Sequence, residues 1–138
     1  MSEQETRNKI SSRRYFEAIW NQGEFTLLND LLAPTYVDHM SSSPAGPEAV
    51  RDEMSMFRKA IPNLHFAIED VIAEDDKVVT RLTVTGTQHA DLPRIPAAGK
   101  QFKVSGIVIF RFQDGKAVEG WMEFNFLGLY RQLGAIPS

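Results

Sequence analysis

Hydrophobic residues recur at helical spacing in the first part of the chain and at strand spacing in the second part. Before residue 63, apolar side chains return every three or four positions, which predicts helices over about 6–21, 25–32 and 47–61. Each helix has a boundary signal. Gly23 follows the first, Pro34 limits the second, and Pro47 suits the first position of the third.

Four strands are predicted after the helices, over about 65–73, 77–88, 101–113 and 116–125. Short polar turns join the first two strands and the last two, and the second turn carries Asp114 and Gly115, a hairpin signal. The proline-containing segment 92–99 is predicted to be a shaped loop, and 126–134 to form one or two helical turns. Helices followed by strands indicate an α+β fold with a largely antiparallel sheet.

The two faces of the last strand differ in polarity. Alternate residues form a polar set that contains one large aromatic (Ala117, Glu119, Trp121, Glu123, Asn125) and an apolar set (Val118, Gly120, Met122, Phe124). The hairpin brings Arg111 within cross-strand reach of Glu119 or Glu123. The polar set is either a solvated charged face or the polar side of an amphipathic cavity, and spacing alone leaves both interpretations open.

Composition narrows the class of protein. The chain has 138 residues, which is the size of one domain, with 43% apolar and 24% charged residues. A net charge of −3 with scattered basic residues argues against nucleic acid as a partner. No apolar run approaches the length of a membrane span, and the first residues lack the pattern of a signal peptide, so we expect a cytoplasmic protein without membrane contact.

Eight short motifs follow one another along the chain: 14–23 (RYFEAIWNQG), 32–39 (LAPTYVDH), 46–50 (GPEAV), 61–64 (IPNL), 86–87 (GT), 95–100 (IPAAGK), 110–116 (FRFQDGK) and 119–134, which opens with EGWMEFN and closes with GLYRQLG. Their order resembles that of the SnoaL-like polyketide cyclase (ester cyclase) family. The resemblance covers about residues 10–135. It therefore implies a single domain over 1–138.

The resemblance implies a nuclear transport factor 2-like cone, in which a curved, mostly antiparallel sheet and N-terminal helices enclose a hydrophobic pocket. It also implies that the polar set of the last strand points into that pocket. Family cyclases close a ring by intramolecular aldol addition without a cofactor, and a carboxylate removes a proton from a carbon next to a carbonyl.

Two positions depart from the family pattern. Asn125 stands where the family usually has its catalytic aspartate, and an amide cannot act as a base at neutral pH although it can hydrogen-bond a carbonyl or hydroxyl. Gln88 holds the place of a family histidine, and His89 is displaced by one residue toward the other side of the strand. Aldol cyclisation, isomerisation and hydration therefore all stay open.

Two further groups are candidates for the base. A pocket would raise the pKa of Glu123, whereas Arg111 would neutralise the same carboxylate in a structural role. His39 beside Asp38 is either a base oriented by a carboxylate or an exposed loop histidine. The predicted catalytic residues are Glu123, Asn125 and His39, and the predicted substrate contacts are Trp121, Arg111, Trp20, Tyr36 and Ile109.

Neither a metal nor a cofactor is expected. The chain has no cysteine, and its histidines at 39, 65 and 89 lack the spacing of a metal site. The sequence thus predicts a cofactor-independent enzyme acting on a hydrophobic, carbonyl-bearing, polyketide-like molecule. The alternative is a non-catalytic module that binds a small molecule in the same pocket. The apolar sets of the last two strands, expected on the outer face of the sheet, predict a homodimer.

Overall fold

The computed structural model describes residues 1–40 and 46–137. Helix α1 (Glu3–Arg14) runs into a π-helical turn, η1 (Tyr15–Trp20). A short 3-10 turn, η2 (Phe25–Leu27), then leads into α2 (Leu28–Leu31). The remaining elements are β1 (Leu32–Asp38), α3 (Pro47–Ala60), β2 (His65–Glu74), β3 (Lys77–Thr87), β4 (Gln101–Gln113), β5 (Lys116–Phe124) and α4 (Phe126–Gln132).

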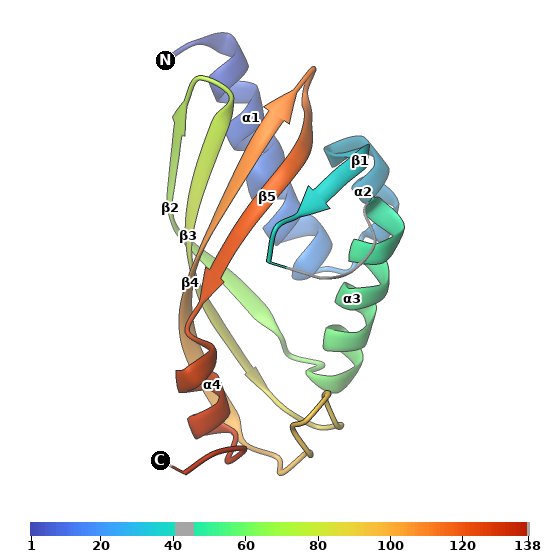
Figure 1. The fold of residues 1–138 in the computed structure, drawn as a ribbon, viewed down its shortest axis with the longest axis vertical. Helices are drawn as coiled ribbons and strands as arrows, with labels where there is room; N and C mark the ends of the chain where they lie inside the picture. Colours follow the sequence, from blue (N-terminus) through green and yellow to red (C-terminus); the bar gives the residue numbers. More distant parts are fainter. Residues whose placement is uncertain (41–45, 138) are drawn as a thin grey trace.

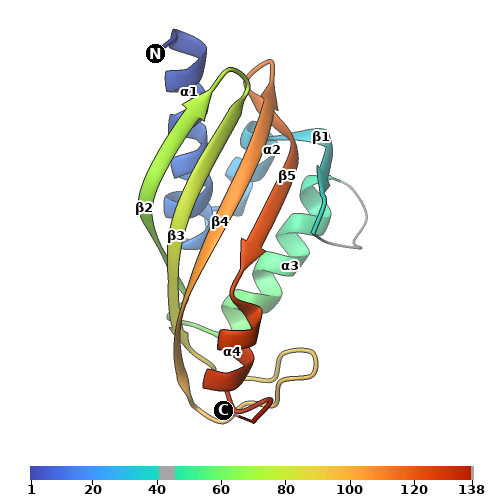
Figure 2. The ribbon, with the colours of Figure 1, turned by 60° about the vertical axis from the view of Figure 1, so that its left-hand side comes forward.

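One five-stranded sheet, in the order β1-β5-β4-β3-β2, forms the frame of the molecule. All neighbouring strands are antiparallel except β1 and β5, which are parallel. Helices α1 and α3 lie on one side of the sheet, and α4 lies at the end of β5 (Figure 1, Figure 2). The predicted α+β fold, its four long strands and the helix after Pro47 are confirmed.

The sequence does not predict strand β1, because Pro34 by itself indicates only the end of a helix. Proline is tolerated in β1 because this strand lies at the edge of the sheet, where one row of backbone groups has no ladder partner. The strand pairs with residues about 80 positions later, Val37 with Glu119 and Asp38 with Gly120. Local pattern carries no sign of such a distant partner.

The apolar residues of β4 face the helices, not the outside of the molecule. Phe102, Val104, Val108, Phe110 and Phe112 are each at most 7% exposed and belong to one core with the aromatic residues of η1. Register pairs Val108 with Met122 and Phe110 with Gly120, so the apolar set of β5 shares this inner face. The predicted position of these residues on an outer, dimer-forming face is therefore wrong. Helices of the same chain cover them.

The π turn η1 positions three aromatic side chains over the inner face. It is marked by the bond from the Asn21 backbone N–H to the Phe16 carbonyl, 3.0 Å, which spans five residues instead of four. The Asn21 side chain then bonds both backbone groups of Phe66 on β2, at 2.7 and 2.9 Å. These bonds fix the end of the first helical segment against the sheet. Tyr15, Phe16 and Trp20 thereby lie at the wall of an internal cavity.

Candidate functional site

A cavity of about 380 Å³ lies between the inner face of the sheet and the segments η1, α3 and α4. Its wall is mostly aliphatic and aromatic, which suits an apolar small molecule. The side chains with a polar group that line it are few among residues 1–40 and 46–137: Tyr15, Trp20, Asp38, Glu53 and Asn125. A bound molecule would therefore meet a hydrophobic surface with a small number of polar contacts.

Asn125 lines this cavity, although it is not part of a strand. It follows the last residue of β5 and caps α4, and its Oδ1 accepts a hydrogen bond from the Gly128 backbone N–H at 2.9 Å. The alternation of β5 does not extend to this position, because the backbone has already turned toward α4. Its Nδ2 group keeps donor capacity that a carbonyl-bearing molecule could use.

Two carboxylates from separate elements also line the cavity. Asp38 ends β1, and its Oδ1 accepts a hydrogen bond from the Met40 backbone N–H at 2.9 Å. Glu53 lies in the middle of α3 and is half-buried. No arginine, lysine or histidine lines the cavity in the described part of the chain. The two acidic groups therefore share an apolar environment without a basic side chain in its wall.

Burial raises the pKa of Glu53 above its ordinary value, and the negative charge of Asp38 raises it further. Burial likewise raises the pKa of the Tyr15 phenol, so this hydroxyl stays protonated and able to donate a hydrogen bond. Tyr36 behaves in the same way but does not line the cavity. The cavity thus holds one carboxyl group with an increased affinity for a proton beside one phenol donor.

Glu53→Gln is expected to raise the melting temperature at pH 8 by ~2–4 °C and to change it little at pH 4. The pKa of Glu53 is higher in the folded than in the unfolded protein, so its protonation favours the folded state. That contribution is complete below the unfolded value of 4.5 and is lost as pH rises through the raised pKa. Melting curves at several pH values measure the melting temperature of Glu53→Gln relative to that of the parent. If this difference became smaller as pH increased, the raised pKa of Glu53 would be contradicted.

Trp121, Glu123, Arg111 and Ile109 lie on the opposite, outer face of the sheet. Register pairs Ile109 with Trp121 and Arg111 with Glu119, and none of these side chains lines the cavity. The expectation that the polar set of β5 points inward is therefore wrong. The physical reason is that the apolar set needs the cover of the helices, and a register shift beside Ala117 breaks simple alternation at the start of the strand.

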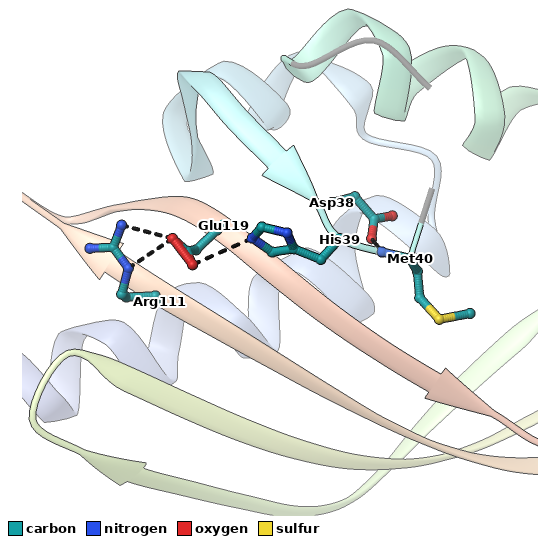
Figure 3. Close-up of polar contacts among 5 residues, drawn as sticks. All are labelled: Asp38, His39, Met40, Arg111 and Glu119. Atoms are coloured by element: carbon teal, nitrogen blue, oxygen red, sulfur yellow. Dashed lines mark hydrogen bonds and ion pairs between the residues drawn. The ribbon is translucent and has the colours of Figure 1, made fainter. Parts of the chain in front are cut away.

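His39 also lies outside the cavity. Its Nε2 is 3.4 Å from a Glu119 carboxylate oxygen, and Arg111 donates two hydrogen bonds to the other oxygen at 2.9 and 3.1 Å. The His39 ring stacks on Trp121 with the ring centres 5.0 Å apart. Figure 3 shows the Asp38 carboxylate directed toward Met40, away from the His39 ring, so Asp38 does not orient this histidine.

Hydrogen bonding from Arg111 lowers the pKa of Glu119, and His39 adds to this effect. The predicted cross-strand pair of Arg111 and Glu119 is confirmed. Arg111 and Glu119 therefore form an ion pair on the outer face, with His39 beside it, and the three side chains cannot reach a molecule in the cavity. Of the predicted substrate contacts, Trp20 lines the cavity, whereas Tyr36 is buried with its hydroxyl over Gly120.

Like Tyr15, Glu53 is a polar lining residue that sequence reasoning missed. It lies three residues after Val50 and four before Phe57, so it falls on the apolar stripe of the third predicted helix. A charged residue within such a stripe is an anomaly, and this anomaly was a usable signal. Asp38 was noticed only as a partner for His39, because the unpredicted strand β1 sends adjacent side chains to opposite faces.

Comparison with known proteins assigns the family. The profile of the SnoaL-like polyketide cyclase family matches residues 11–133. The chain belongs to this family. TsrD from Streptomyces laurentii is 30% identical, with a TM-score of 0.90 and 99% of each chain covered. A Bacillus cereus protein proposed to be a polyketide cyclase is 31% identical, with a TM-score of 0.82, 99% of this chain covered and 87% of the other.

Members of the SnoaL-like fold differ in the chemistry assigned to them. AclR from Streptomyces galilaeus, proposed to be a hydroxylase, is 24% identical to this chain, with a TM-score of 0.82 over 97% of this chain and 85% of its own. Among curated proteins, none matches this sequence. The SnoaL-like fold therefore defines the cavity but leaves the reaction to its lining residues.

Two classes of feature are absent from the described residues. None of the helices there has the length and hydrophobicity needed to cross a membrane. No three histidine, aspartate or glutamate side chains of residues 1–40 and 46–137 come together as metal ligands would.

Proposed function

We propose that this SnoaL-like protein is a cofactor-independent enzyme acting on a hydrophobic, carbonyl-bearing small molecule of polyketide type. The reaction proposed is a cyclisation, isomerisation or hydration that proceeds by acid–base chemistry. The single observation that supports it best is the apolar cavity of about 380 Å³ with ionisable carboxyl groups in its wall. A cavity that only held an apolar ligand would gain nothing from half-buried carboxyl groups, since each costs desolvation energy.

Asn125 is proposed to bind a carbonyl or hydroxyl of the substrate, and Trp20 to form part of the apolar wall. Their positions in the lining support these roles. Glu123, His39, Arg111, Trp121 and Ile109 are left out of the proposed site, because their side chains belong to the other face of the sheet. The family relation supports a polyketide-like substrate through the activity named for relatives.

Turnover and binding of one hydrophobic aryl diketone test the proposal. We expect the diketone to bind and to be consumed at a rate that depends on pH between 5 and 9, with no added metal or cofactor. Binding measured by calorimetry and product formation measured by chromatography separate the two readouts. If several diketones bound but none was turned over, the proposed enzymatic function would be contradicted. The alternative, a small-molecule-binding module, would then be supported.

We further propose that two copies of the chain associate through the outer face of the sheet. A row of side chains crosses four strands there in direct register, Ile72 beside Val79, Val79 beside Ile109, and Ile109 beside Trp121. Ile72 is 61% exposed in the single chain. A second copy would cover this row and remove its apolar surface from water.

Light scattering is expected to give a mass of twice 15.6 kDa at micromolar concentration. Ile109→Lys places a charge in the middle of the row and should shift the mass toward one chain. Ser105→Lys, on the same face of the same strand but outside the row, is the matched control and should leave the mass unchanged. A single-chain mass for the parent would contradict the association.

A further inference from the structure

The cavity contains a charge arrangement that packing does not explain. Glu53 comes from α3 and Asp38 from β1, so two separate elements direct carboxyl groups into one apolar space. No ion pair joins either group to a cation within residues 1–40 and 46–137. Where a carboxylate of the described residues does have a cationic partner, the pair lies on the surface, as Asp70 with Arg81 at 2.6 Å.

A structural role would call for a partner that offsets the cost of burying these charges. The titratable groups that influence Glu53 and the two phenols around it are acidic or phenolic: Asp38 and Tyr36 on β1 and Tyr15 on η1. None of them can supply a positive charge. Two like charges in one site are accommodated when one of them holds a proton, as in catalytic carboxyl pairs.

We propose that Glu53 and Asp38 form the acid–base pair of the cavity, in which Glu53 is the catalytic residue that exchanges a proton with the substrate and Asp38 is a positioning residue whose charge holds that proton on Glu53. This inference rests on the proposed function. The proposed function requires a base, and this inference assigns that role to Glu53. Neither the family pattern nor strand alternation indicated Glu53 or Asp38 for these roles.

The proposed reaction needs no proton from outside the site, because Glu53 takes one proton from the substrate and later returns it. The Glu53 carboxylate takes a proton from a carbon next to a substrate carbonyl, and the electron pair of the broken C–H bond forms an enolate. The Tyr15 hydroxyl, which lines the same cavity, donates a hydrogen bond to the enolate oxygen. Protonated Glu53 then returns its proton, either to another carbon of the enolate or to the alkoxide that forms when the enolate attacks a second carbonyl.

Deuterium exchange into 2-tetralone tests the pair without requiring the natural substrate. This compound is a small apolar ketone with exchangeable hydrogens next to its carbonyl, and NMR in D₂O follows their replacement. The intact protein should accelerate exchange. Glu53→Gln should lower the protein-dependent rate by roughly 10²–10⁴-fold. Glu48→Gln, the same substitution at an exposed position of α3, is the matched control and should keep the parent rate.

Asp38→Asn tests the positioning role through the pH profile. The amide retains an Oδ1 that can accept from the Met40 backbone N–H, so local structure is kept while the charge is lost. Removal of a nearby negative charge makes Glu53 release its proton more readily, so the acidic limb of the rate profile should move to lower pH. A limb that stays in place, or moves to higher pH, would overturn the role of Asp38.

The outcomes separate this inference from the function on which it rests. If the parent exchanges deuterium and Glu53→Gln does so equally well while its circular dichroism is native, the pair is overturned and the proposed enzyme stands. If the parent binds 2-tetralone but neither exchanges it nor consumes the diketone, both are overturned. Loss of exchange in Glu53→Gln, together with native circular dichroism and the shifted limb in Asp38→Asn, supports the pair.

Discussion

Phe110→Ala is expected to lower the free energy of unfolding by about 3–5 kcal/mol, which is the cost of deleting a fully buried aromatic ring and leaving its volume empty. Phe110 is 1% exposed, and its ring centre lies 4.9 Å from that of Tyr15 and 6.1 Å from that of Tyr36. The ring therefore connects strand β4 to η1 and to strand β1. Since domains of this size are stable by about 5–15 kcal/mol, the loss would be a large part of the total.

Urea denaturation followed by circular dichroism measures this loss. Phe126→Ala is the matched control, because it removes the same side chain from a position that is 39% exposed, and it should cost about 1 kcal/mol. Equal losses in the two variants would show that the core is not centred on Phe110. Phe110→Ala should also disturb the cavity wall, because the Tyr15 ring packs against the deleted Phe110 ring.

Asn125→Asp is expected to increase base-dependent exchange of an apolar ketone by roughly 10²-fold. The substitution adds a third carboxylate to Asp38 and Glu53 in the cavity wall, at the position where the family resemblance implies an aspartate. The fold should survive, because an aspartate Oδ can accept the Gly128 backbone N–H as Asn125 Oδ1 does. Nearby carboxylates raise one another's pKa, so the gain should be largest at alkaline pH.

The measurement is the rate of ketone exchange at several pH values from 5 to 9, for the parent and for Asn125→Asp. Asn29→Asp makes the same chemical change at an exposed position that does not line the cavity, and its rate should equal that of the parent. An Asn125→Asp variant that binds the ketone as tightly as the parent and exchanges it no faster would contradict a catalytic position for this residue.

Local signals in the sequence accounted for most of the secondary structure. The helix after Pro47 and the hairpin at Asp114 and Gly115 follow from residue types whose backbone preferences act over a few positions. The start of α1 was also encoded locally, since Ser2 and Glu5 form a capping box, yet the predicted helix began later. The family motifs extended these local signals to the whole fold.

The direction of the side chains depended on what each face was packed against. Alternation separated Trp121 and Glu123 from Met122 and Phe124, but it could not say which set faces the helices. The helices cover the apolar set, so the polar set, and with it His39 and Arg111, lies outside. Asn125 lines the cavity because α4 begins there and ends the alternation of the strand.

The sequence by itself determined the order of the main helices and the four long strands, the α+β class and the family, but not strand β1. Periodicity, turn residues and motifs are properties of neighbouring positions. Tertiary structure alone decided which carboxyl groups share the cavity. Asp38 reaches it because β1 pairs with a strand about 80 residues later, and Glu53 because α3 packs over the same space. The two carboxyl groups come together through contacts between segments that are far apart in the sequence. The burial that raises the pKa of Glu53 exists only after those segments have packed.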